Sequence, residues 1–128
     1  MGVFDKSNTS VNSKETTIIS SKAKINGNLK LESNLHIDGE VKGKIESNVM
    51  VSIGKTGILD GEVYAKKLVI NGKFIGKADC DNIEILKNGV LNGDIEVTNL
   101  IVEAGAIFEG HCKKKNANKE KPINRKEK

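Results

Sequence analysis

The stretch Ile37–Ala78, IDGEVKGKIESNVMVSIGKTGILDGEVYAKKLVINGKFIGKA, repeats one short phrase as VKGKI, LDGEV and FIGKA. Each phrase has an apolar residue, any residue, glycine, a charged residue, and a small or apolar residue. The phrase recurs on both sides of the stretch, with spacings of 16, 18, 15, 17 and 17 residues between its glycines. These glycines are Gly27, Gly43, Gly61, Gly76, Gly93 and Gly110. A repeat of this length predicts an architecture of stacked units.

Apolar side chains around each glycine follow the two-residue period of a β-strand. The residue two places before the glycine is large and apolar in every repeat, and the residue two places after it is able to lie in an interior. A second phrase, two apolar residues flanking one residue of any kind, follows as LHI, VMV, LVI, IEI and LIV. Helical spacing explains neither phrase. Each repeat therefore predicts two or three short strands, too few to bury an apolar face alone.

Stacking the repeats buries these faces, because equivalent residues then lie above one another as in a solenoid. The first interior column holds Ile25, Val41, Leu59, Phe74, Leu91 and Phe108, and the second holds Leu29, Ile45, Val63, Ala78, Ile95 and Cys112. We predict an all-β fold, a right-handed parallel β-helix of about six coils over residues 18–112. The left-handed β-helix of hexapeptide-type acyltransferases repeats one aliphatic residue every six positions. The uneven spacings and the i, i+2 pairs favour the right-handed coil.

The charge of the chain is concentrated at its C-terminal end. The 128 residues carry 21 Lys and Arg against 17 Asp and Glu, and residues 113–128 hold eight of these basic residues beside two Glu. Residues 18–112 hold 11 Lys and 13 acidic residues, a net charge of −2. The repeat block therefore does not predict a basic nucleic-acid platform, and aromatic side chains for base stacking are scarce. We expect no nucleic-acid partner, and disordered tails over residues 1–17 and 113–128.

The series VKGKI, LDGEV, FIGKA and LNGDI, with short polar tails on both sides, resembles the bactofilins, polymer-forming cytoskeletal proteins of bacteria. The resemblance covers about residues 18–112, and IGKTG at residues 53–57 is similar to the cell-shape bactofilins of helical and curved bacteria. It implies a triangular β-helix whose subunits join end to end, without nucleotide, into homopolymeric filaments. It also implies a location at the cytoplasmic face of the inner membrane. Cell-wall hydrolases or membrane scaffold proteins would be the partners through which the filament sets cell shape.

The two ends of the predicted stack are expected to form the polymerisation interface. Sheet edges leave backbone groups unpaired, and a monomeric solenoid needs polar capping coils. The first coil begins TTIISSKAKI and the last ends AGAIFEGHC, and neither is a polar cap. The expected contact residues are Ile18, Ile19, Ile107, Phe108 and Cys112. The resemblance implies the same for Phe108, since a terminal-coil phenylalanine is important for assembly in the family; the alternative is an ordinary core residue.

Each tail has a predicted contact and an alternative. Met1, Val3 and Phe4 resemble the short apolar membrane-targeting tail of some bactofilins, and many weak copies along a filament would add up. The alternative is a disordered N-terminal tail that binds neither membrane nor any other ligand. The basic C-terminal tail either attracts anionic lipid or another acidic partner, or keeps filaments from sticking sideways.

A third predicted surface is an apolar stripe in the middle of the second phrase. Its outward positions carry His36, Met50, Val69, Glu84 and Ile101. Met50, Val69 and Ile101 would form a stripe for lateral packing or for a partner protein. The alternative is scattered exposed apolar residues, which are normal on protein surfaces.

The sequence offers few candidate catalytic residues. His36 and His111 lie far apart in the sequence, and neither has a serine or cysteine at a spacing typical of a catalytic dyad. Cys80 and Cys112 are expected in the interior, and no phosphate-binding glycine motif occurs. We predict a structural protein of the reducing cytoplasm, with no enzyme activity, cofactor or metal. The alternatives are a trimeric hexapeptide-type acyltransferase and a monomeric adaptor.

Overall fold

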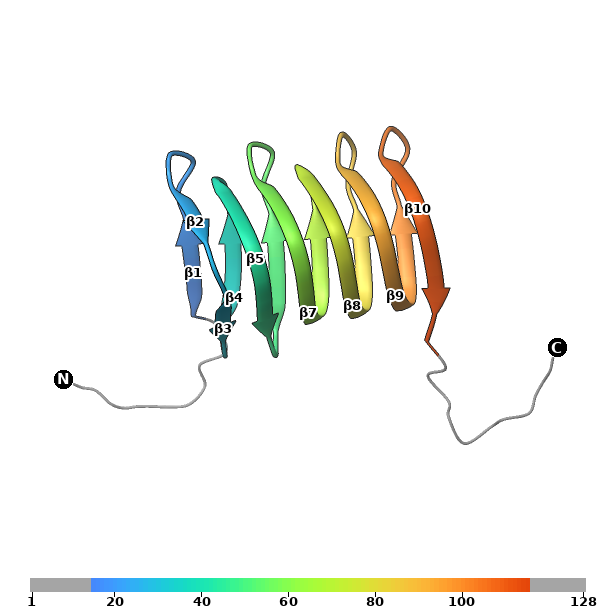
Figure 1. Ribbon diagram of the computed structural model, residues 1–128. Helices are drawn as coiled ribbons and strands as arrows, with labels where there is room; N and C mark the ends of the chain where they lie inside the picture. The colour runs from blue at the N-terminus through green and yellow to red at the C-terminus, as the bar shows by residue number, and fades with distance from the viewer. Residues whose placement is uncertain (1–14, 116–128) are drawn as a thin grey trace, which may run out of the picture.

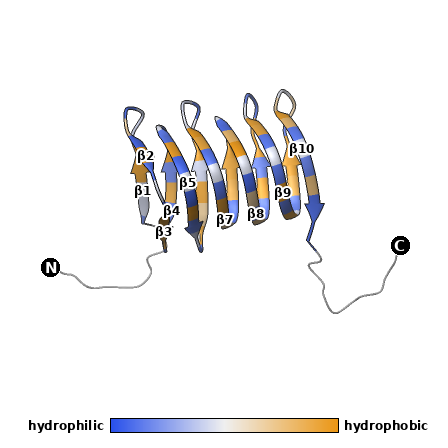
Figure 2. Cartoon of the chain, in the orientation of Figure 1, coloured by the Kyte–Doolittle hydropathy of each residue, from blue (hydrophilic) through white to orange (hydrophobic). Residues whose placement is uncertain are grey.

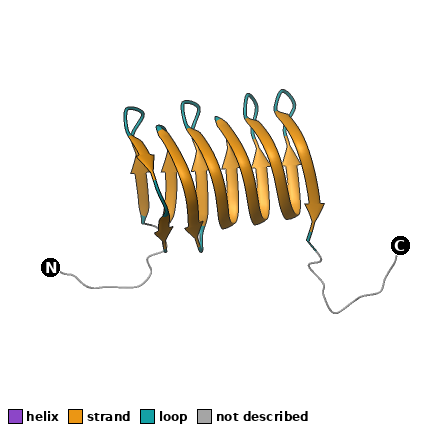
Figure 3. Cartoon of the chain, viewed as in Figure 1, coloured by secondary structure: helices purple, strands orange, loops and turns teal. Residues whose placement is uncertain are grey.

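The chain winds into a right-handed parallel β-helix in the computed structural model, which describes residues 15–115 (Figure 1). Within this part of the chain strands and short loops make up the whole structure (Figure 3). The strands are β1 (Thr16–Ile19), β2 (Lys24–Asn26), β3 (Leu29–Leu31), β4 (Asn34–Ile37), β5 (Glu40–Ser47), β6 (Met50–Ile53), β7 (Ile58–Ile70), β8 (Lys73–Ile85), β9 (Val90–Val102) and β10 (Ile107–Lys114). The predicted all-β solenoid of about six coils is confirmed.

Each coil has three faces, and each face pairs in parallel with the same face of the next coil. Coils 1 to 6 are residues 16–31, 34–47, 50–65, 67–80, 82–97 and 99–114. Face A is the first four residues of each coil, face B is the stretch before the repeated glycine, and face C is the stretch after it. In β7, β8 and β9 one strand continues through faces B and C into face A of the next coil. The strands therefore run from 16 to 114, two residues beyond the predicted block at each end.

The repeated glycines form the corner between faces B and C. All six have a positive φ, from +131° at Gly76 to +149° at Gly61, which L side chains rarely adopt. From Gly43 onward, a Cβ at each of these positions would clash with the carbonyl oxygen of the equivalent glycine in the preceding coil. Gly27 in coil 1 has no such neighbour, because nothing precedes it in the stack. The corner thus needs glycine both for its φ and for its close coil-to-coil contact.

The core consists of apolar columns that run along the stack. The register confirms both predicted columns, and Phe74 is fully buried in the face B column between Leu59 and Leu91. Face A adds two columns, which hold Leu35, Val51, Leu68 and Ile83, and Ile37, Ile53, Ile70 and Ile85. Figure 2 shows the resulting alternation of apolar and polar residues along the strands. Burial of aliphatic side chains, at about 25 cal/mol per Å², is the main stabilising contribution.

Ser47 is the one polar residue that is buried in the described part of the chain. Its Oγ donates a hydrogen bond to the Ser33 carbonyl oxygen (2.8 Å) and accepts one from the Val49 amide (3.1 Å). Ser33 lies at the corner between faces C and A where coil 1 passes into coil 2, and Val49 lies at the same corner one coil later. The buried hydroxyl is thereby paired, as burial of a polar group requires.

The register at coil 3 differs from the one expected from the sequence. Val51 lies beside Leu35 and Leu68, so the second phrase of this coil is Val51–Ile53 and not VMV at 49–51. Val49 and Val51 are two residues apart, and a two-residue period therefore fits both registers. Strand pairing selects the register that places Ile53 beside the buried Ile37.

This register corrects the predicted apolar stripe. Met50 lies opposite Lys67, in a different column from Val69. Ser52 occupies the place expected for Met50, and Glu84 separates Val69 from Ile101. The structure does not bring Met50, Val69 and Ile101 together.

Candidate functional site: the two ends of the β-helix

The C-terminal end leaves apolar core columns incomplete. In face B the column passes from the fully buried Leu91 to the half-buried Phe108. In face A it passes from the fully buried Ile85 to Val102, which is 43% exposed. Cys112 is exposed, although the sequence predicted an interior position. Its column is inward, but coil 6 has no coil above it, so its thiol is open to solvent.

The N-terminal end shows the same incompleteness. Ile25, Leu29 and Leu31 in coil 1 are half-buried, whereas Val41 and Ile45 in the same columns of coil 2 have no exposed surface. Ile19 is an exception among the end residues, because it is buried. Each end therefore presents apolar side chains that one further coil would cover.

Two of the predicted interface residues lie on outer faces. Ile18 pairs with the outward His36 and is 64% exposed, and Ile107 pairs with the outward Val90 and is 49% exposed. Strand alternation explains this, since Ile19 and Phe108 beside them take the inward positions. Ile18 and Ile107 thus lie at the rim of each end and not on its apolar centre. Four other residues have inward positions at the ends but were not predicted as interface residues: Ile25, Leu29, Leu31 and Val102.

Backbone groups at both ends have a neighbouring strand on one side. Strands β1, β2 and β3 pair with coil 2, and β10 pairs with β9. Their other edges carry N–H and C=O groups that a further parallel or antiparallel strand would satisfy. An exposed strand edge can pair with a strand of another molecule through main-chain hydrogen bonds, and the uncovered apolar side chains beside it can pack against that molecule.

Lys115 fastens the end of the last coil to the body of the helix. Its Nζ lies 2.6 Å from Asp79 Oδ1 and 3.4 Å from Asp81 Oδ1, and these aspartates lie at the end of coil 4 and directly after it. The Lys115 amide also donates to the Val97 carbonyl oxygen (2.7 Å). Partial burial lowers the pKa of Lys115, but the hydrogen bonds and charges of Asp79 and Asp81 outweigh it, so the pKa is raised above 10.5. We call Lys115, Asp79 and Asp81 the clasp.

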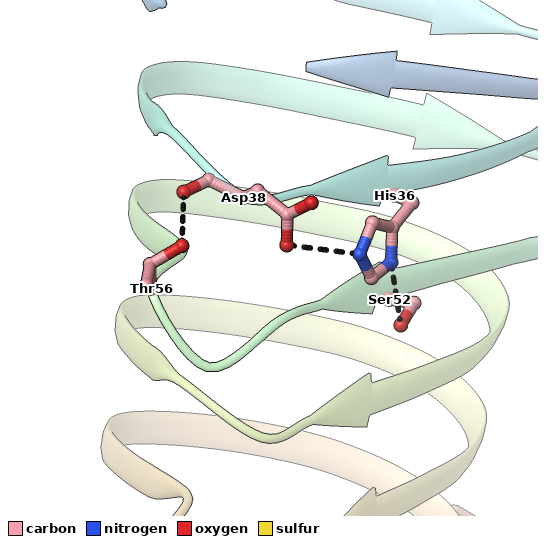
Figure 4. Close-up of polar contacts among 4 residues, drawn as sticks. All are labelled: His36, Asp38, Ser52 and Thr56. Atoms are coloured by element: carbon pink, nitrogen blue, oxygen red, sulfur yellow. Dashed lines mark hydrogen bonds and ion pairs between the residues drawn. The ribbon is translucent and has the colours of Figure 1, made fainter. Parts of the chain in front are cut away.

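A polar cluster joins coils 2 and 3 on face A (Figure 4). His36 Nε2 lies 3.0 Å from Asp38 Oδ1 and His36 Nδ1 lies 3.3 Å from Ser52 Oγ, while Thr56 Oγ1 donates to the Asp38 carbonyl oxygen (2.7 Å). A side chain at Gly54 would clash with Asp38. The sequence reasoning missed this cluster because it placed Met50, and not Ser52, beside His36. Its contacts cross-link two consecutive turns.

Face C carries a hollow of about 350 Å³ over coils 3 to 6. Tyr64, Asp79, Asp94, His111 and Cys112 are among its lining residues. His111 Nδ1 lies 3.2 Å from Asp94 Oδ1, and the hydrogen bond that Tyr64 donates to Glu62 (2.9 Å) raises the pKa of Tyr64. Basic and acidic residues alternate along one outward column of this face, from Lys44 through Glu62 and Lys77 to Asp94 and His111.

Metal ligands and reactive thiols do not converge within residues 15–115. No group of three or more His, Cys, Asp or Glu side chains there could hold a metal ion. Cys80 is buried, as predicted, and desolvation raises the pKa of its thiol to about 12. The thiol is therefore protonated at neutral pH, and a protonated buried thiol is a poor nucleophile. The same part of the chain has no helix long and apolar enough to cross a membrane.

The family of the chain follows from its match to a known domain. The Bactofilin domain, described as polymer-forming cytoskeletal, matches residues 17–113. The chain belongs to the bactofilin family. No curated protein matches it. The family resemblance inferred from the glycine phrases is thereby confirmed, and the cytoskeletal, polymer-forming character expected from it holds for the family.

Two solved structures resemble this bactofilin over most of its length. The Thermus thermophilus bactofilin, solved by cryo-electron microscopy as double helical filaments, has 25% sequence identity and a TM-score of 0.67. That match covers 75% of this chain and 98% of the other. The cytoskeletal bactofilin BacA, solved by solid-state NMR, has 30% identity and a TM-score of 0.73, over 79% of this chain and 97% of the other. The right-handed β-helix is thus shared with proteins that form filaments or are cytoskeletal.

Proposed function

We propose that this bactofilin polymerises by stacking the ends of its β-helix, without nucleotide or metal. The uncovered end columns carry the proposal: Phe108, Val102 and Cys112 at one end, and Ile25, Leu29 and Leu31 at the other. A second copy placed on either end would cover these side chains and pair the free strand edges. Ile18 and Ile107 would lie at the rim of the junction.

We also propose that two such filaments associate side by side. The double helical filaments of the Thermus thermophilus protein support this, since two strands wound together need a contact between them. Side-by-side contact needs little surface per subunit, because a filament repeats the contact many times.

The filament is proposed to lie at the cytoplasmic face of the inner membrane and to position cell-wall hydrolases or membrane scaffold proteins that set cell shape. Family membership supports this part. Met1, Val3 and Phe4, the proposed membrane contact, lie outside the described residues. Removal of residues 1–4 should release the filament from vesicles in a flotation assay while polymerisation continues. A filament that floats equally well without these residues would contradict the membrane contact.

The decisive experiment is negative-stain electron microscopy of purified wild-type protein and of a Phe108→Arg variant. An arginine in the end column would bury an unpaired charge in the junction, which costs several kcal/mol. We expect filaments from the wild type and short particles from the variant. Tyr64→Arg, on the outer side of face C, is a control that should still polymerise. Uniform monomers or closed trimers of the wild type would overturn the proposal in favour of an adaptor or a closed oligomer.

A further inference from the structure

The outer side of face B carries apolar residues in four consecutive coils. These are Ile58, Ile75, Val90 and Ile107, one from each of coils 3 to 6. Ile58 is 37% exposed and Ile107 is 49% exposed, and Ile75 and Val90 are half-buried. Ile58, Val90 and Ile107 share one column with Lys73, and Ile75 lies in the next column, between Asp60 and Asn92. We call these four residues the face B patch.

The other outer surfaces lack such a run. On face A, polar residues separate the apolar ones in the column Ile18, His36, Ser52, Val69, Glu84 and Ile101. On face C, one outward column is Lys44, Glu62, Lys77, Asp94 and His111, and the next holds Glu46, Tyr64, Asp79, Glu96 and Lys113. Coils 1 and 2 of face B are also polar, with an ion pair between Lys24 and Glu40 (4.0 Å). Within the described residues, outward apolar side chains in four consecutive coils thus occur only in coils 3 to 6 of face B.

We infer that the face B patch is the surface through which one filament contacts a second filament of the same chain. This inference rests on the proposed function and adds the residues of the lateral contact. At about 4.8 Å between coils, the patch extends roughly 15 Å along the stack. It reaches coil 6, where Ile107 lies at the rim of the end. Stacking would therefore repeat the patch once per subunit along the filament.

The patch is too small to hold two single subunits together, and it is therefore suited to contact between filaments. Four side chains cover far less than the roughly 800 Å² per partner that a standard stable interface buries. A pair of single subunits would therefore dissociate readily. In a filament the same contact recurs in every subunit, so its small free energy is multiplied by the number of repeats.

The charges beside the patch favour a second copy of the chain over a membrane. Asp60 and Glu109 flank it on one side and Lys73 interrupts it. Carboxylates are repelled by anionic lipid headgroups. Both signs of charge are available, however, for contact with an identical surface related by two-fold symmetry.

The test compares two matched substitutions in coil 4, Ile75→Lys on face B and Val69→Lys on face A. Both positions are half-buried and outward, and each new lysine would lie beside an acidic residue of a neighbouring coil, Asp60 or Glu84 respectively. Both changes thus place the lysine next to a carboxylate, and Glu84 already pairs with Lys67 (3.8 Å). Thermal unfolding followed by circular dichroism confirms that each variant is folded, and electron microscopy of filaments at equal protein concentration measures their width.

We expect paired filaments from the wild type and from Val69→Lys, and single filaments from Ile75→Lys. Paired filaments from Ile75→Lys, or single filaments from the wild type, would overturn the inference while leaving end-to-end stacking intact. Wild-type protein without filaments of any kind would instead refute the proposed function. A flotation assay with vesicles of phosphatidylcholine and phosphatidylglycerol is the second readout. Binding of the wild type that Ile75→Lys alone abolishes would assign the patch to lipid and overturn the filament contact.

Discussion

At the scale of single residues, the corner between faces B and C requires glycine, and six glycines form one column there. Their positive φ excludes most side chains by strain, and the preceding coil excludes a Cβ by contact from Gly43 onward. Gly27 differs, since it has the same φ of +146° but open space where a Cβ would be. A substitution at Gly27 thus measures the cost of backbone strain alone, and a substitution at a later glycine adds the cost of a steric clash.

Gly76→Ala should therefore destabilise the protein more than Gly27→Ala. The strain of a non-glycine residue at positive φ costs about 1–3 kcal/mol at either position. At Gly76 the added methyl group must also displace the Gly61 carbonyl, and we expect a further loss of at least about 2 kcal/mol. Urea unfolding of both variants, followed by circular dichroism, measures the difference. Equal midpoints would show that the stack relaxes around the methyl group.

At the scale of the element, the clasp determines how the chain leaves the last coil. Lys115, directly after coil 6, reaches back across coil 5 to Asp79 and Asp81. The strand end is thereby held at the corner between faces C and A. The end of the stack, where Phe108 and Cys112 are uncovered, is left accessible.

Lys115→Met should lower the free energy of unfolding by about 1 kcal/mol at neutral pH. Because the pKa of Lys115 is raised in the folded protein, its contribution is complete below pH 10.5 and is lost as the pH rises through the higher folded pKa. The difference between wild type and variant should therefore stay constant up to about pH 10 and shrink above it. Urea titrations at a series of pH values measure this.

The control for the clasp is Lys113→Met, which removes a charge from an exposed position of β10, two residues before Lys115. We expect it to change stability by less than about 0.5 kcal/mol. A loss of equal size in both variants, or a loss at Lys115 that is independent of pH, would contradict the ion pairs of the clasp.

Most of the elements were predictable because their signals are local and repeated. The glycine phrase and the i, i+2 apolar pairs fix faces B and C, and the register confirms each of those pairs. Face A of coil 3 was not predictable from period alone, because Val49 and Val51 satisfy the same alternation. That ambiguity also hid the contact between His36 and Ser52. The clasp was not predictable from a repeat pattern either. Its side chains come from distant positions, with Lys115 and Asp81 separated by 34 residues.

End effects and outer faces explain the remaining differences. Cys112 is in the interior column that the repeat predicts, yet it is exposed because a column position is buried only where another coil follows. The face B patch was not predicted, because outward apolar residues were expected only in the second phrase of each repeat. The residues on either side of each face B core residue, such as Ile58 before Leu59 and Ile75 after Phe74, were the signal that could have revealed it.

On the scale of the whole molecule, the coils are units that contact their neighbours alone, so a coil should be removable. Leu59 and Phe74 are equivalent in register, as are Asp60 and Ile75. Deletion of residues 60–74 joins Leu59 to Ile75 and preserves the alternation of inward and outward side chains. We expect a folded, less stable protein whose filaments have an axial repeat shortened by about 4.8 Å. Cryo-electron microscopy of the filaments measures the repeat.

Deletion of residues 60–73 is the matched control. It leaves one extra residue in the strand, and Phe74 would then face outward beside an inward Leu59. This variant should fail to fold cooperatively. An unchanged axial repeat in the first variant, or a stable fold in the second, would contradict the modular stack.

Hydrogen bonds between coils point along the axis of the β-helix, so a pulling force on a filament acts on them directly. The first coil is held by strands of 4, 3 and 3 residues, whereas β7 and β8 have 13 residues each. Under tension the short strands yield first and the inner coils keep their length. A bactofilin filament built from such subunits would respond to stretching by opening at coil 1, beside its joints, and would close again when the force is removed.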